Sequence, residues 1–493
     1  AGITRTGAGG SGMPIRTGKE YLEGLRDSRE IWYAGERVKD VTTHHALRHT
    51  AQSLARLYDL QHEPDLIDSM TYPSPTSGER VGMSYIMPRT IDDLVKRRRM
   101  MQRWADATCG MMGRTPDFLN VSVMGFASHR DFFAQCGPQY GENIWRYYEH
   151  IREHDRCLTH TLVPPQIDRS KAASQQADPY LVLGVVRETS AGVVVRGARM
   201  LATLAPFSDE LAVYPSTFRG FQGDEQRYAT MFAVPVATPG LKFICREGFD
   251  LNRPLWDHPL GSRFDEMDCV AVFDDVLVPW ERVFLYNNTE LYNRTFAATK
   301  HLAHIGHQVA VKNIAKTEFV LGVACLIAET IGIKDFLHVQ EKLGELITYL
   351  ETLKACTRAA EVDAEPNAMG VLELAQDPLH TVRLMFPYWY PRMVELLQLL
   401  GAGGFMMTPS QHDLNSPIGP LIEKYYQGAD APGSDRVKLF KLAWDLVGDA
   451  IGSRQVLYER FFSGDPVRNM ALRYVSYDKT AVVDKVKAFL GAY

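Results

Sequence analysis

Apolar residues at helical spacing mark the first part of the chain. Residues 44–59 carry apolar side chains three or four positions apart, which predicts a helix with one buried stripe. A second helix is expected over residues 91–112, where a basic start is followed by an apolar stretch. The N-terminal part is therefore predicted to be mainly helical.

The pattern changes to strand-like in the middle of the chain. Residues 180–204 contain two β-branched runs on either side of a Ser-Ala-Gly turn, which predicts a hairpin. Glycine, proline and polar residues separate further short apolar runs. These runs predict strands at 210–216, 228–235, 241–245 and 268–278.

The helical period returns from about residue 296. One face of residues 337–353 is apolar, and long helices are also expected over 308–332, 379–400 and 436–462. Helices and strands in separate blocks indicate an α+β protein rather than a βαβ sheet. Long C-terminal helices with apolar stripes favour a bundle. More apolar helix face than one bundle needs would indicate that subunits pack together, and an oligomer is expected.

Composition narrows the class of protein. The chain has 493 residues, of which 45% are hydrophobic and 23% charged, as in ordinary globular proteins. The net charge of -5 argues against nucleic acid or an anionic membrane as the main partner. The longest uncharged apolar run, residues 319–328, is about half as long as the roughly 20 residues that span a membrane. We therefore expect no membrane segment.

The cysteines and the N-terminus indicate a location. The 7 cysteines are widely spaced and form no CxxC pair, which is typical of a reducing cytoplasm with mostly buried, inert thiols. The N-terminus lacks the basic and apolar segments of a signal peptide. Residues 1–12 are interpreted as a flexible leader or tag remnant. A cytoplasmic protein is predicted.

Common sequence motifs predict no dinucleotide-binding or metal site in this chain. Residues 7–12 fit GxGxxG, but no strand precedes them, so they do not predict a dinucleotide site. The glycines at 401–404 are expected to end a helix. His301, His304 and His307 are three apart, yet the first and third point about 120° apart on a helix. We expect surface or interface histidines there and no metal site.

Six stretches together resemble one enzyme family. They are REIWYAGERVKDVTTH (29–44), MGRTPDFLN (112–120), THTLVPPQIDR (159–169), DHPLGSRFDEMD (257–268), FDDVLVPWERVF (273–284) and GSRQVLYERFFSGDP (452–466). They resemble the oxygenase component of the two-component, FADH2-dependent 4-hydroxyphenylacetate 3-hydroxylases. The resemblance is collinear from about residue 13 to the C-terminus.

The resemblance implies a fold and partners. The fold would be acyl-CoA-dehydrogenase-like, with an N-terminal helical domain (13–157), a middle β-barrel domain (158–290) and a C-terminal helical bundle (291–493). Such proteins are homotetramers, arranged as a dimer of dimers. They receive FAD as FADH2 from a separate NAD(P)H-flavin reductase and use O2 as co-substrate.

The implied reaction adds one oxygen atom ortho to a phenol hydroxyl through a C4a-hydroperoxyflavin. The expected substrate is 4-hydroxyphenylacetate and the product 3,4-dihydroxyphenylacetate. A tyrosine-like phenol, free or tethered to a carrier protein, and a halogenated phenol remain alternatives. The chemistry requires a cation or base at the phenol hydroxyl and a site that excludes water.

Three positions are implied at the phenol hydroxyl. Arg114 would stabilise phenolate charge, the structural alternative being an ion pair with Asp117. His160 would take the phenol proton near pH 7. The third position is a tyrosine in relatives and Phe118 here. Because phenylalanine cannot donate a hydrogen bond, this departure leaves the hydrogen-bond count and the exact substrate open.

Other implied contacts concern the carboxylate and the flavin. Ser216 and Thr217 would donate hydroxyl hydrogen bonds to a small acid, or simply end a strand, and residues 218–221 would form a lid. A C-terminal loop would close over the flavin, with a glycine allowing close approach. The flavin contacts implied are His160, Thr161, Leu162, Val163, Gln166, Ile167, Asp168, Arg169, Thr203, Ile451, Gly452, Ser453 and Arg454.

One charged loop is assigned to structure instead. Arg263, Asp265, Glu266 and Asp268 are expected to form an internal network of arginine and carboxylates.

The sequence disfavours two other functions. A dehydratase of the same fold, acting on 4-hydroxybutyryl-CoA, needs clustered cysteines for an iron–sulfur cluster, and the sequence has none. A non-catalytic flavin binder is disfavoured because Arg114 and His160 are both present.

Overall fold

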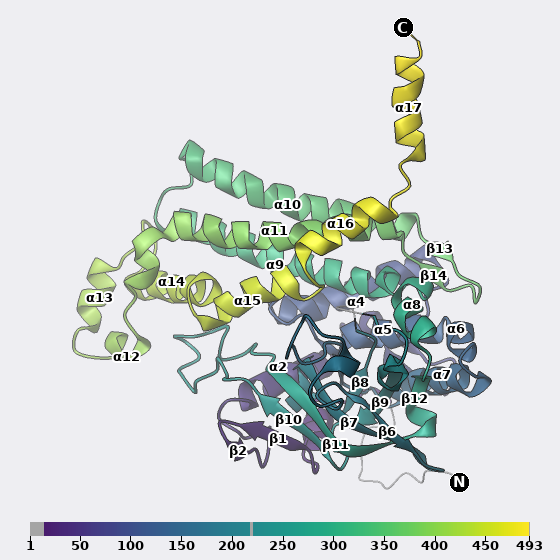
Figure 1. Cartoon of the computed structure of the whole chain (residues 1–493). Helices are drawn as coiled ribbons and strands as arrows, with labels where there is room; N and C mark the ends of the chain where they lie inside the picture. Colours follow the sequence, from purple (N-terminus) through teal and green to yellow (C-terminus); the bar gives the residue numbers. More distant parts are fainter. Residues whose placement is uncertain (1–13, 217–219, 493) are drawn as a thin grey trace.

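The computed structural model describes residues 14–216 and 220–492. The expected leader at residues 1–12 and its GxGxxG pattern lie outside this part. Helices and small sheets form the lower body in Figure 1, and long helices lie across its top. This agrees with the α, β, α order predicted from the sequence.

The N-terminal part is largely helical. The predicted helices at 44–59 and 91–112 are confirmed as α2 and α4. Helix α5 was not predicted, because every one of its residues is buried and it therefore shows no apolar stripe. The elements are α1 (Gly18–Gly24), α2 (Arg48–Leu60), α3 (Ile67–Met70), β3 (Thr71–Pro73), β4 (Arg80–Gly82), α4 (Ile91–Ala107), α5 (Pro116–Ala127), α6 (Arg130–Ala134) and α7 (Pro138–Glu153).

The middle strands form two sheets, and neither strand order closes into a ring among the described residues. The expected barrel is thus open. In order across the larger sheet, the strands are β2 (Glu36–Arg37), β1 (Glu30–Tyr33), β10 (Leu241–Cys245), β11 (Asp268–Pro279), β7 (Gly192–Thr203) and β6 (Gly184–Glu188). The smaller sheet contains β12 (Val283–Tyr286), β9 (Thr230–Pro235), β8 (Glu210–Val213) and β5 (Leu158–Thr161).

The sheets agree with the predicted strands, with one addition. The hairpin expected at 180–204 is confirmed as β6 and β7. Strands β1 and β2 come from the N-terminal part, and β1 pairs with β10 in parallel. The first part of the chain is therefore not helical alone. The two sheets meet where Thr159 donates to the carbonyl of Thr203 at 2.6 Å and Val163 bridges to Met200.

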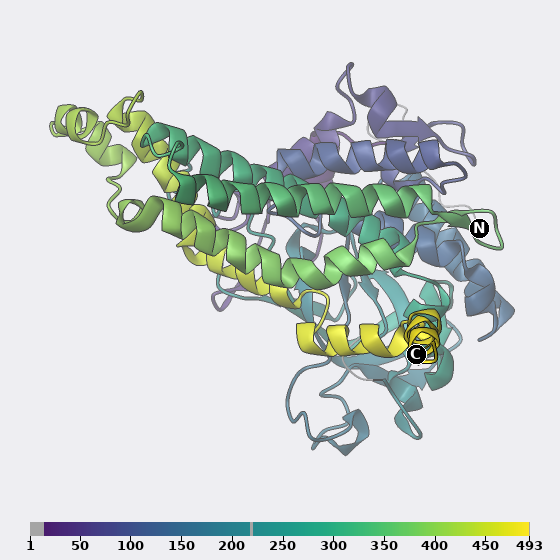
Figure 2. The same ribbon diagram turned by 90° about the horizontal axis from the view of Figure 1, so that it is seen from above.

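The C-terminal part is a helical bundle. Figures 1 and 2 show α9, α10 and α11 lying side by side. The elements are α8 (Thr289–Ala298), α9 (Leu302–Thr330), α10 (Leu337–Val362), β13 (Glu365–Pro366), β14 (Leu372–Glu373), α11 (Gln376–Gly401), α12 (Gln411–Leu414), α13 (Gly419–Tyr425), α14 (Gly433–Val447), α15 (Ala450–Phe461), α16 (Pro466–Ser476) and α17 (Thr480–Leu490).

Two details of the bundle test the predictions. Helix α11 ends at Gly401, as expected. The single helix predicted over 436–462 is wrong, because the chain breaks between α14 and α15. Gly448 ends α14, packed against the Trp444 ring so closely that a Cβ would lie 2.3 Å from it. Asp449 then starts α15 by accepting from the backbone N–H of Ala450.

The histidines of α9 are not at the surface. His301, His304 and His307 are 7%, 1% and 0% exposed, because α4, α5, α10 and α11 pack around α9. His307 lies 2.9 Å from a carboxylate oxygen of Glu361 and 3.1 Å from Arg97. The surface expectation is therefore corrected to a buried polar network, and an interface between subunits is not needed to explain these residues.

The burial of the cysteines and the character of the helices can be compared with the predicted cytoplasmic location. All the cysteines are free, but only Cys157 and Cys269 are buried and the others are half-buried, so the thiols are less enclosed than expected. In the part of the chain that the structure describes, no helix has the length and apolar character needed to cross a membrane. The cytoplasmic location stays a prediction.

Two lysines and one glutamate are buried between α9 and α15. Glu459 of α15 forms ion pairs with Lys312 and, at 2.8 Å, with Lys316, both from α9. Burial alone would raise the pKa of Glu459, but the two lysines outweigh it and hold that pKa below its usual range. Burial also lowers the pKa of Lys316 to about 8. This cluster fixes α15 against the centre of the bundle.

We predict that Glu459→Gln destabilises the protein by about 3–5 kcal/mol, because it leaves two buried lysines without their counter-charge. Chemical denaturation monitored by circular dichroism measures this change. Asp92→Asn is the control, since Asp92 pairs with Lys96 on an exposed helix face and its loss should leave unfolding unchanged. Equal effects of the two variants would contradict the structural role of the buried cluster.

Candidate active site

The residues predicted at the phenol hydroxyl lie together. Arg114 precedes α5, and the backbone N–H groups of Gly113 and Arg114 donate to the Glu266 carboxylate at 2.9 and 2.7 Å. The guanidinium carbon lies 4.0 Å from the ring centre of Phe118, on α5. The His160 ring, on β5, is 5.5 Å from that of Phe118. The mainly helical N-terminal part and strand β5 of the middle part therefore supply one buried cluster.

The Arg114 guanidinium is buried, and no carboxylate in the described part of the chain pairs with it. Arg114 is 9% exposed and has no ion pair within the described residues. The alternative pairing with Asp117 is not found, because Asp117 accepts from the Thr115 hydroxyl at 2.5 Å. Burying a cation without a counter-charge is costly. The arrangement therefore favours a ligand that carries or develops negative charge beside Arg114.

His160 is buried and neutral. It is 7% exposed, and its Nδ1 has no hydrogen-bond partner in the described part of the chain. Burial, together with the nearby charge of Arg114 and with His301, lowers the pKa of His160 well below its usual value. The imidazole is therefore neutral near pH 7 and can accept a hydrogen bond from a ligand hydroxyl.

A hydrogen-bonded group lies behind His160 that the sequence did not indicate. The Ser122 hydroxyl is 3.0 Å from the hydroxyl of Tyr214 and 3.2 Å from Nε2 of His301. The Tyr214 ring packs edge-on against His160, with 5.5 Å between ring centres. This group holds the ring of His160 from the rear and keeps water away from it.

The residues predicted to line the flavin follow β5 where the two sheets meet. Thr161 is buried and donates to the Met200 carbonyl at 2.7 Å. Gln166 donates to the Pro164 carbonyl, whereas its buried Oε1 has no partner in the described part of the chain. Ile167 is exposed, and Asp168 accepts from Ser170. The unpaired acceptor of Gln166 fits a ligand that donates a hydrogen bond there.

Arg199 links this segment to the loop predicted to hold a carboxylate. Its guanidinium donates to the carbonyl of Leu162 at 2.5 Å and to the hydroxyl of Tyr292 at 3.0 Å. The same hydroxyl accepts from the backbone N–H of Ser216 at 3.2 Å. Thr217, like residues 218 and 219 of the predicted lid, lies outside the described residues. Sequence reasoning missed Arg199 and Tyr292, which carry no motif signal.

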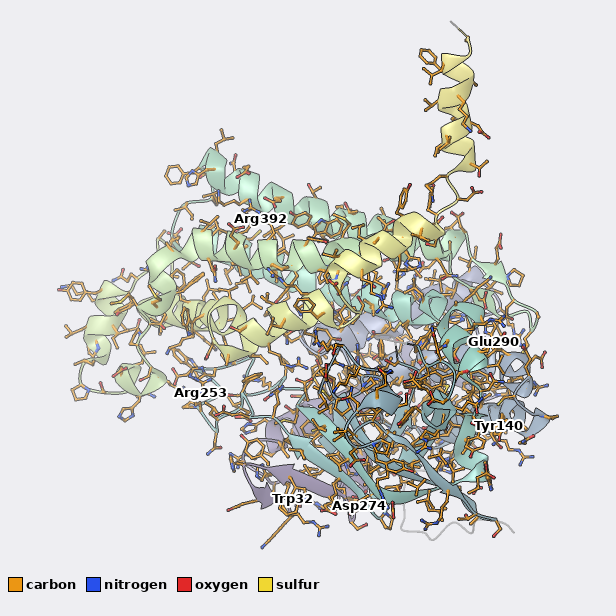
Figure 3. All side chains as sticks on the ribbon, viewed as in Figure 1. Trp32, Tyr140, Arg253, Asp274, Glu290 and Arg392 are labelled. Atoms are coloured by element: carbon orange, nitrogen blue, oxygen red, sulfur yellow. The ribbon has the colours of Figure 1, made fainter. Side chains whose placement is uncertain are left out.

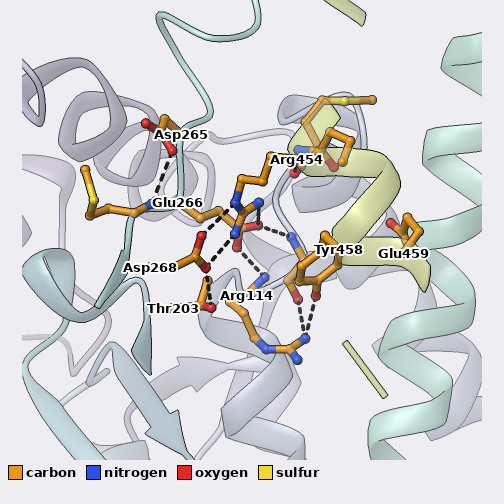
Figure 4. A network of polar contacts seen from close by, with 12 residues as sticks. Arg114, Thr203, Asp265, Glu266, Asp268, Arg454, Tyr458 and Glu459 are labelled. Atoms are coloured by element: carbon orange, nitrogen blue, oxygen red, sulfur yellow. Dashed lines mark hydrogen bonds and ion pairs between the residues drawn. The ribbon is translucent and has the colours of Figure 1, made fainter. Parts of the chain in front are cut away.

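The expected network of arginine and carboxylates is present (Figure 4). Asp268 pairs with Arg454 at 2.9 Å and with Arg246 at 2.8 Å. Burial opposes ionisation, but Arg454 and Arg246 together hold the pKa of Asp268 far below its usual range. Asp265 pairs with Arg246 at 2.6 Å. Arg263 was expected to belong to this network, and that expectation is wrong: its guanidinium donates to the backbone carbonyls of Leu255 and Pro259.

Two predicted flavin contacts are engaged in this network. The hydroxyl of Thr203 donates to Asp268 at 2.7 Å, and Arg454 also lies 3.4 Å from Glu266. Residues 451–454 are not a loop, because they form the first turn of α15. Gly452 permits a close approach of the Leu446 carbonyl, which would lie 2.5 Å from a Cβ. The glycine is thus explained by the junction of α14 and α15.

Sequence reasoning also missed Tyr458. It lies on α15, and its hydroxyl accepts from a guanidinium N–H of Arg114 at 2.6 Å (Figure 4). A tyrosine in an apolar helix reads as a core residue, so no local signal marked it. Only its place in the GSRQVLYERFF stretch associated it with the site.

The fold and the buried Arg–His–aromatic cluster define a protein of the acyl-CoA-dehydrogenase-like class, and comparison with known proteins makes the assignment narrower. Residues 17–285 match the family "4-hydroxyphenylacetate 3-hydroxylase N terminal", and residues 292–491 match "4-hydroxyphenylacetate 3-hydroxylase C terminal". The chain therefore belongs to the 4-hydroxyphenylacetate 3-hydroxylase family.

Individual relatives are similar over nearly their whole length. A 4-hydroxyphenylacetate 3-monooxygenase oxygenase component from Thermus thermophilus is 46% identical, over 96% of this chain and 97% of the relative. The corresponding protein of Geobacillus is 45% identical, over 97% of each chain. A crystal structure of such an oxygenase component, complexed with FAD and 4-hydroxyphenylacetate, has a TM-score of 0.93 at 46% identity and covers 97% of this chain and 98% of its own.

One distant structure shares the fold alone. An archaeal 4-hydroxybutyryl-CoA dehydratase from N. maritimus has a TM-score of 0.87 at 19% identity, over 97% of this chain and 95% of its own. This confirms the fold class and says nothing of the reaction.

Asp117, next to Phe118, provides a pH-dependent prediction. Burial raises its pKa to about 6, although Thr115 and Gln308 oppose this. Because the folded pKa lies above the unfolded value, its contribution to stability is present below about pH 4 and is lost as pH rises through 6. The free energy of unfolding of Asp117→Asn, relative to that of the wild type, should therefore increase by up to about 3 kcal/mol between pH 4 and pH 8. Urea unfolding at both pH values measures this, and a gain independent of pH would contradict it.

Proposed function

We propose that the chain is the oxygenase component of a two-component 4-hydroxyphenylacetate 3-monooxygenase. It would take reduced FAD from a separate NAD(P)H-flavin reductase, use O2 and convert 4-hydroxyphenylacetate to 3,4-dihydroxyphenylacetate. The observation that carries the proposal is the buried guanidinium of Arg114, which forms no ion pair with any described residue and lies beside Phe118 and neutral His160. The similarity to oxygenase components at 46% and 45% identity supports it.

The residues of the cluster have complementary roles in this reaction. Arg114 stabilises the negative charge that develops on the phenol oxygen, and neutral His160 accepts the phenol proton. Phe118 packs against the ring and excludes water. Ser216 and Thr217 are proposed to hold the substrate carboxylate at the other end. Arg199 and Tyr292 connect the backbone of Ser216 to that of Leu162, two residues after His160.

The residues along β5 are suited to a flavin. FAD, when bound in its reduced form, supplies the electrons that activate O2. His160–Val163 and Gln166–Arg169 would hold it, and the unpaired acceptor of Gln166 offers a place for a donor. The Asp268 network would fix Thr203 and the start of α15, from Ile451 to Arg454, at the flavin. FAD is present in the similar oxygenase structure.

A free small acid is favoured over a carrier-bound phenol. A Streptomyces globisporus monooxygenase that acts on a substrate attached to a peptidyl-carrier protein is 34% identical to this chain. The relatives named for 4-hydroxyphenylacetate reach 46%. That group ranges from 32% to 46% identity, and its members at 45% and 46%, well above the carrier-protein enzyme, support 4-hydroxyphenylacetate as the substrate.

The proposed assembly is a homotetramer in which the C-terminal helices join subunits. Figures 1 and 3 show α17 and its side chains standing clear of the body. Val482, Val486 and Leu490 lie four residues apart on α17 and are 50%, 58% and 54% exposed. Such an apolar stripe on a projecting helix requires another surface. A second copy of the chain fits, because the bundle also leaves large apolar side chains exposed, among them Leu326 (50%), Phe336 (56%) and Leu337 (82%).

We predict that Arg114→Ala lowers kcat/KM for 4-hydroxyphenylacetate by about 10²–10³-fold, because the charge that stabilises the phenolate is lost. Flavin binding should remain nearly intact. The measurement is 3,4-dihydroxyphenylacetate formed from chemically reduced FAD and O2, with flavin affinity measured separately. His160→Ala should behave in the same way.

Arg196→Ala is the matched control, because Arg196 pairs with Asp275 at the surface at 2.7 Å. Normal hydroxylation by both Arg114→Ala and His160→Ala would refute the assignment of the phenol end. A wild-type protein that formed no catechol would refute 4-hydroxyphenylacetate as the substrate.

The assembly is tested by Val486→Asp. A carboxylate in the apolar stripe of α17 should split the tetramer into smaller species, because a charge cannot be buried in the contact without a partner. Light scattering after gel filtration measures the mass, and Val486→Leu is the control that keeps the stripe apolar. An unchanged mass for Val486→Asp would show that α17 does not join the subunits.

A further inference from the structure

The direction of the Arg114 guanidinium depends on one hydroxyl. Within the described residues, its hydrogen bonds are 2.6 Å to Oη of Tyr458 and a long 3.4 Å to the carbonyl of its neighbour Gly113. Phe118 contributes only the face of its ring, at 4.0 Å. A ring face attracts a cation without fixing its rotation. The bond to Tyr458 is therefore the strong directional contact of the site's cation.

Tyr458 is itself held firmly. Its ring stacks on Phe462, with 5.2 Å between ring centres and 12° between planes. The next residue, Glu459, lies in the buried ion pairs with Lys312 and Lys316. Gln455, one turn earlier, donates to the Met111 carbonyl at 2.9 Å. These contacts give the Tyr458 hydroxyl one position relative to the loop that carries Arg114.

The glycine before Arg114 makes room for this contact. A Cβ at Gly113 would lie 2.0 Å from Oη of Tyr458 and 2.5 Å from the carbon that bears it. Any side chain at position 113 would thus displace the tyrosine. The loop and α15 are matched to each other at this point, although they come from opposite ends of the chain.

We propose that Tyr458 is a positioning residue that orients the Arg114 guanidinium toward the phenol oxygen of the substrate. The guanidinium is planar and carries five N–H donors in fixed directions, so holding one of them sets the direction of the rest. Tyr458 acts through Arg114 rather than on the reacting atoms. The inference rests on the proposed function, because it specifies how that site recognises a phenol.

The test uses Tyr458→Phe in the full-length protein. This variant keeps the ring and its stacking on Phe462 and removes only the acceptor. We expect kcat/KM for 4-hydroxyphenylacetate to fall about tenfold or more, as for loss of a hydrogen bond to a charged group. The pKa of bound 4-nitrophenol, read from its phenolate absorbance, should rise by about 1, because the cation no longer faces the phenolate. A purely structural role would not move this second value.

Tyr390→Phe is the matched control. Tyr390 is buried in the bundle, and in the described part of the chain its hydroxyl has no hydrogen-bond partner. This variant should leave both kcat/KM and the pKa of bound 4-nitrophenol unchanged. Thermal unfolding of each variant shows whether the protein remains folded.

Two further variants make the test specific. Phe118→Tyr, added to Tyr458→Phe, returns a hydroxyl next to the guanidinium and should recover at least part of the lost activity. Gly113→Ala should lower kcat/KM in the same way although Tyr458 itself is unchanged, because the added methyl group displaces the Tyr458 hydroxyl. Wild-type values of kcat/KM and of the probe's pKa in Tyr458→Phe would overturn the inference, and so would a fall in activity with no change in the probe's pKa.

The outcomes separate this inference from the proposed function. If the wild type formed no catechol but the pKa of bound 4-nitrophenol still rose in Tyr458→Phe, the substrate would be wrong and the positioning role would stand. If the wild type hydroxylated 4-hydroxyphenylacetate and Tyr458→Phe matched it in both measurements, the proposed function would stand and the positioning role of Tyr458 would be wrong.

Discussion

Buried charges at two places along α15 hold this helix in a single position. Near its end, Glu459 lies between two lysines of α9, and at its start Arg454 pairs with Asp268 and Glu266. Charges removed from water must keep their partners, so α15 cannot shift along α9 or away from the sheets without exposing one. The bundle and the middle sheets are thereby joined at the site, and the loop before α5 is fixed as well, because Glu266 also accepts its backbone N–H groups.

The spacing of apolar residues predicted helices that have one exposed face and one buried face. The helix α2 follows this rule and was placed correctly, and the hairpin of β6 and β7 was placed from its β-branched runs on either side of a Ser-Ala-Gly turn. Helix α5 was missed because it is buried on all sides. The histidines at 301, 304 and 307 were expected at the surface or at an interface, whereas all three are buried in the bundle, where His307 contacts Arg97 and Glu361. The break at Gly448 depends on one local contact that no apolar pattern records.

The site was predictable only in part. Arg114, Phe118 and His160 came from the resemblance to a family, and the structure brings them together. The residues that orient them were not predictable, because their contacts join distant parts of the chain. Tyr458 and Arg114 are 344 positions apart in the sequence. Arg199 and Tyr292 likewise matter through bonds to a backbone carbonyl and a backbone N–H, which leave no mark on the residue types involved.

The projecting α17 ties the order of the C-terminus to protein concentration. A helix of 11 residues is marginal in water by itself, and none of the residues of α17 that the structure describes is buried. If its shape is completed by a second copy, dilution removes that support by mass action. The midpoint of thermal unfolding would then rise with concentration, and a dilute sample would lose the ordered end of the chain before its catalytic core.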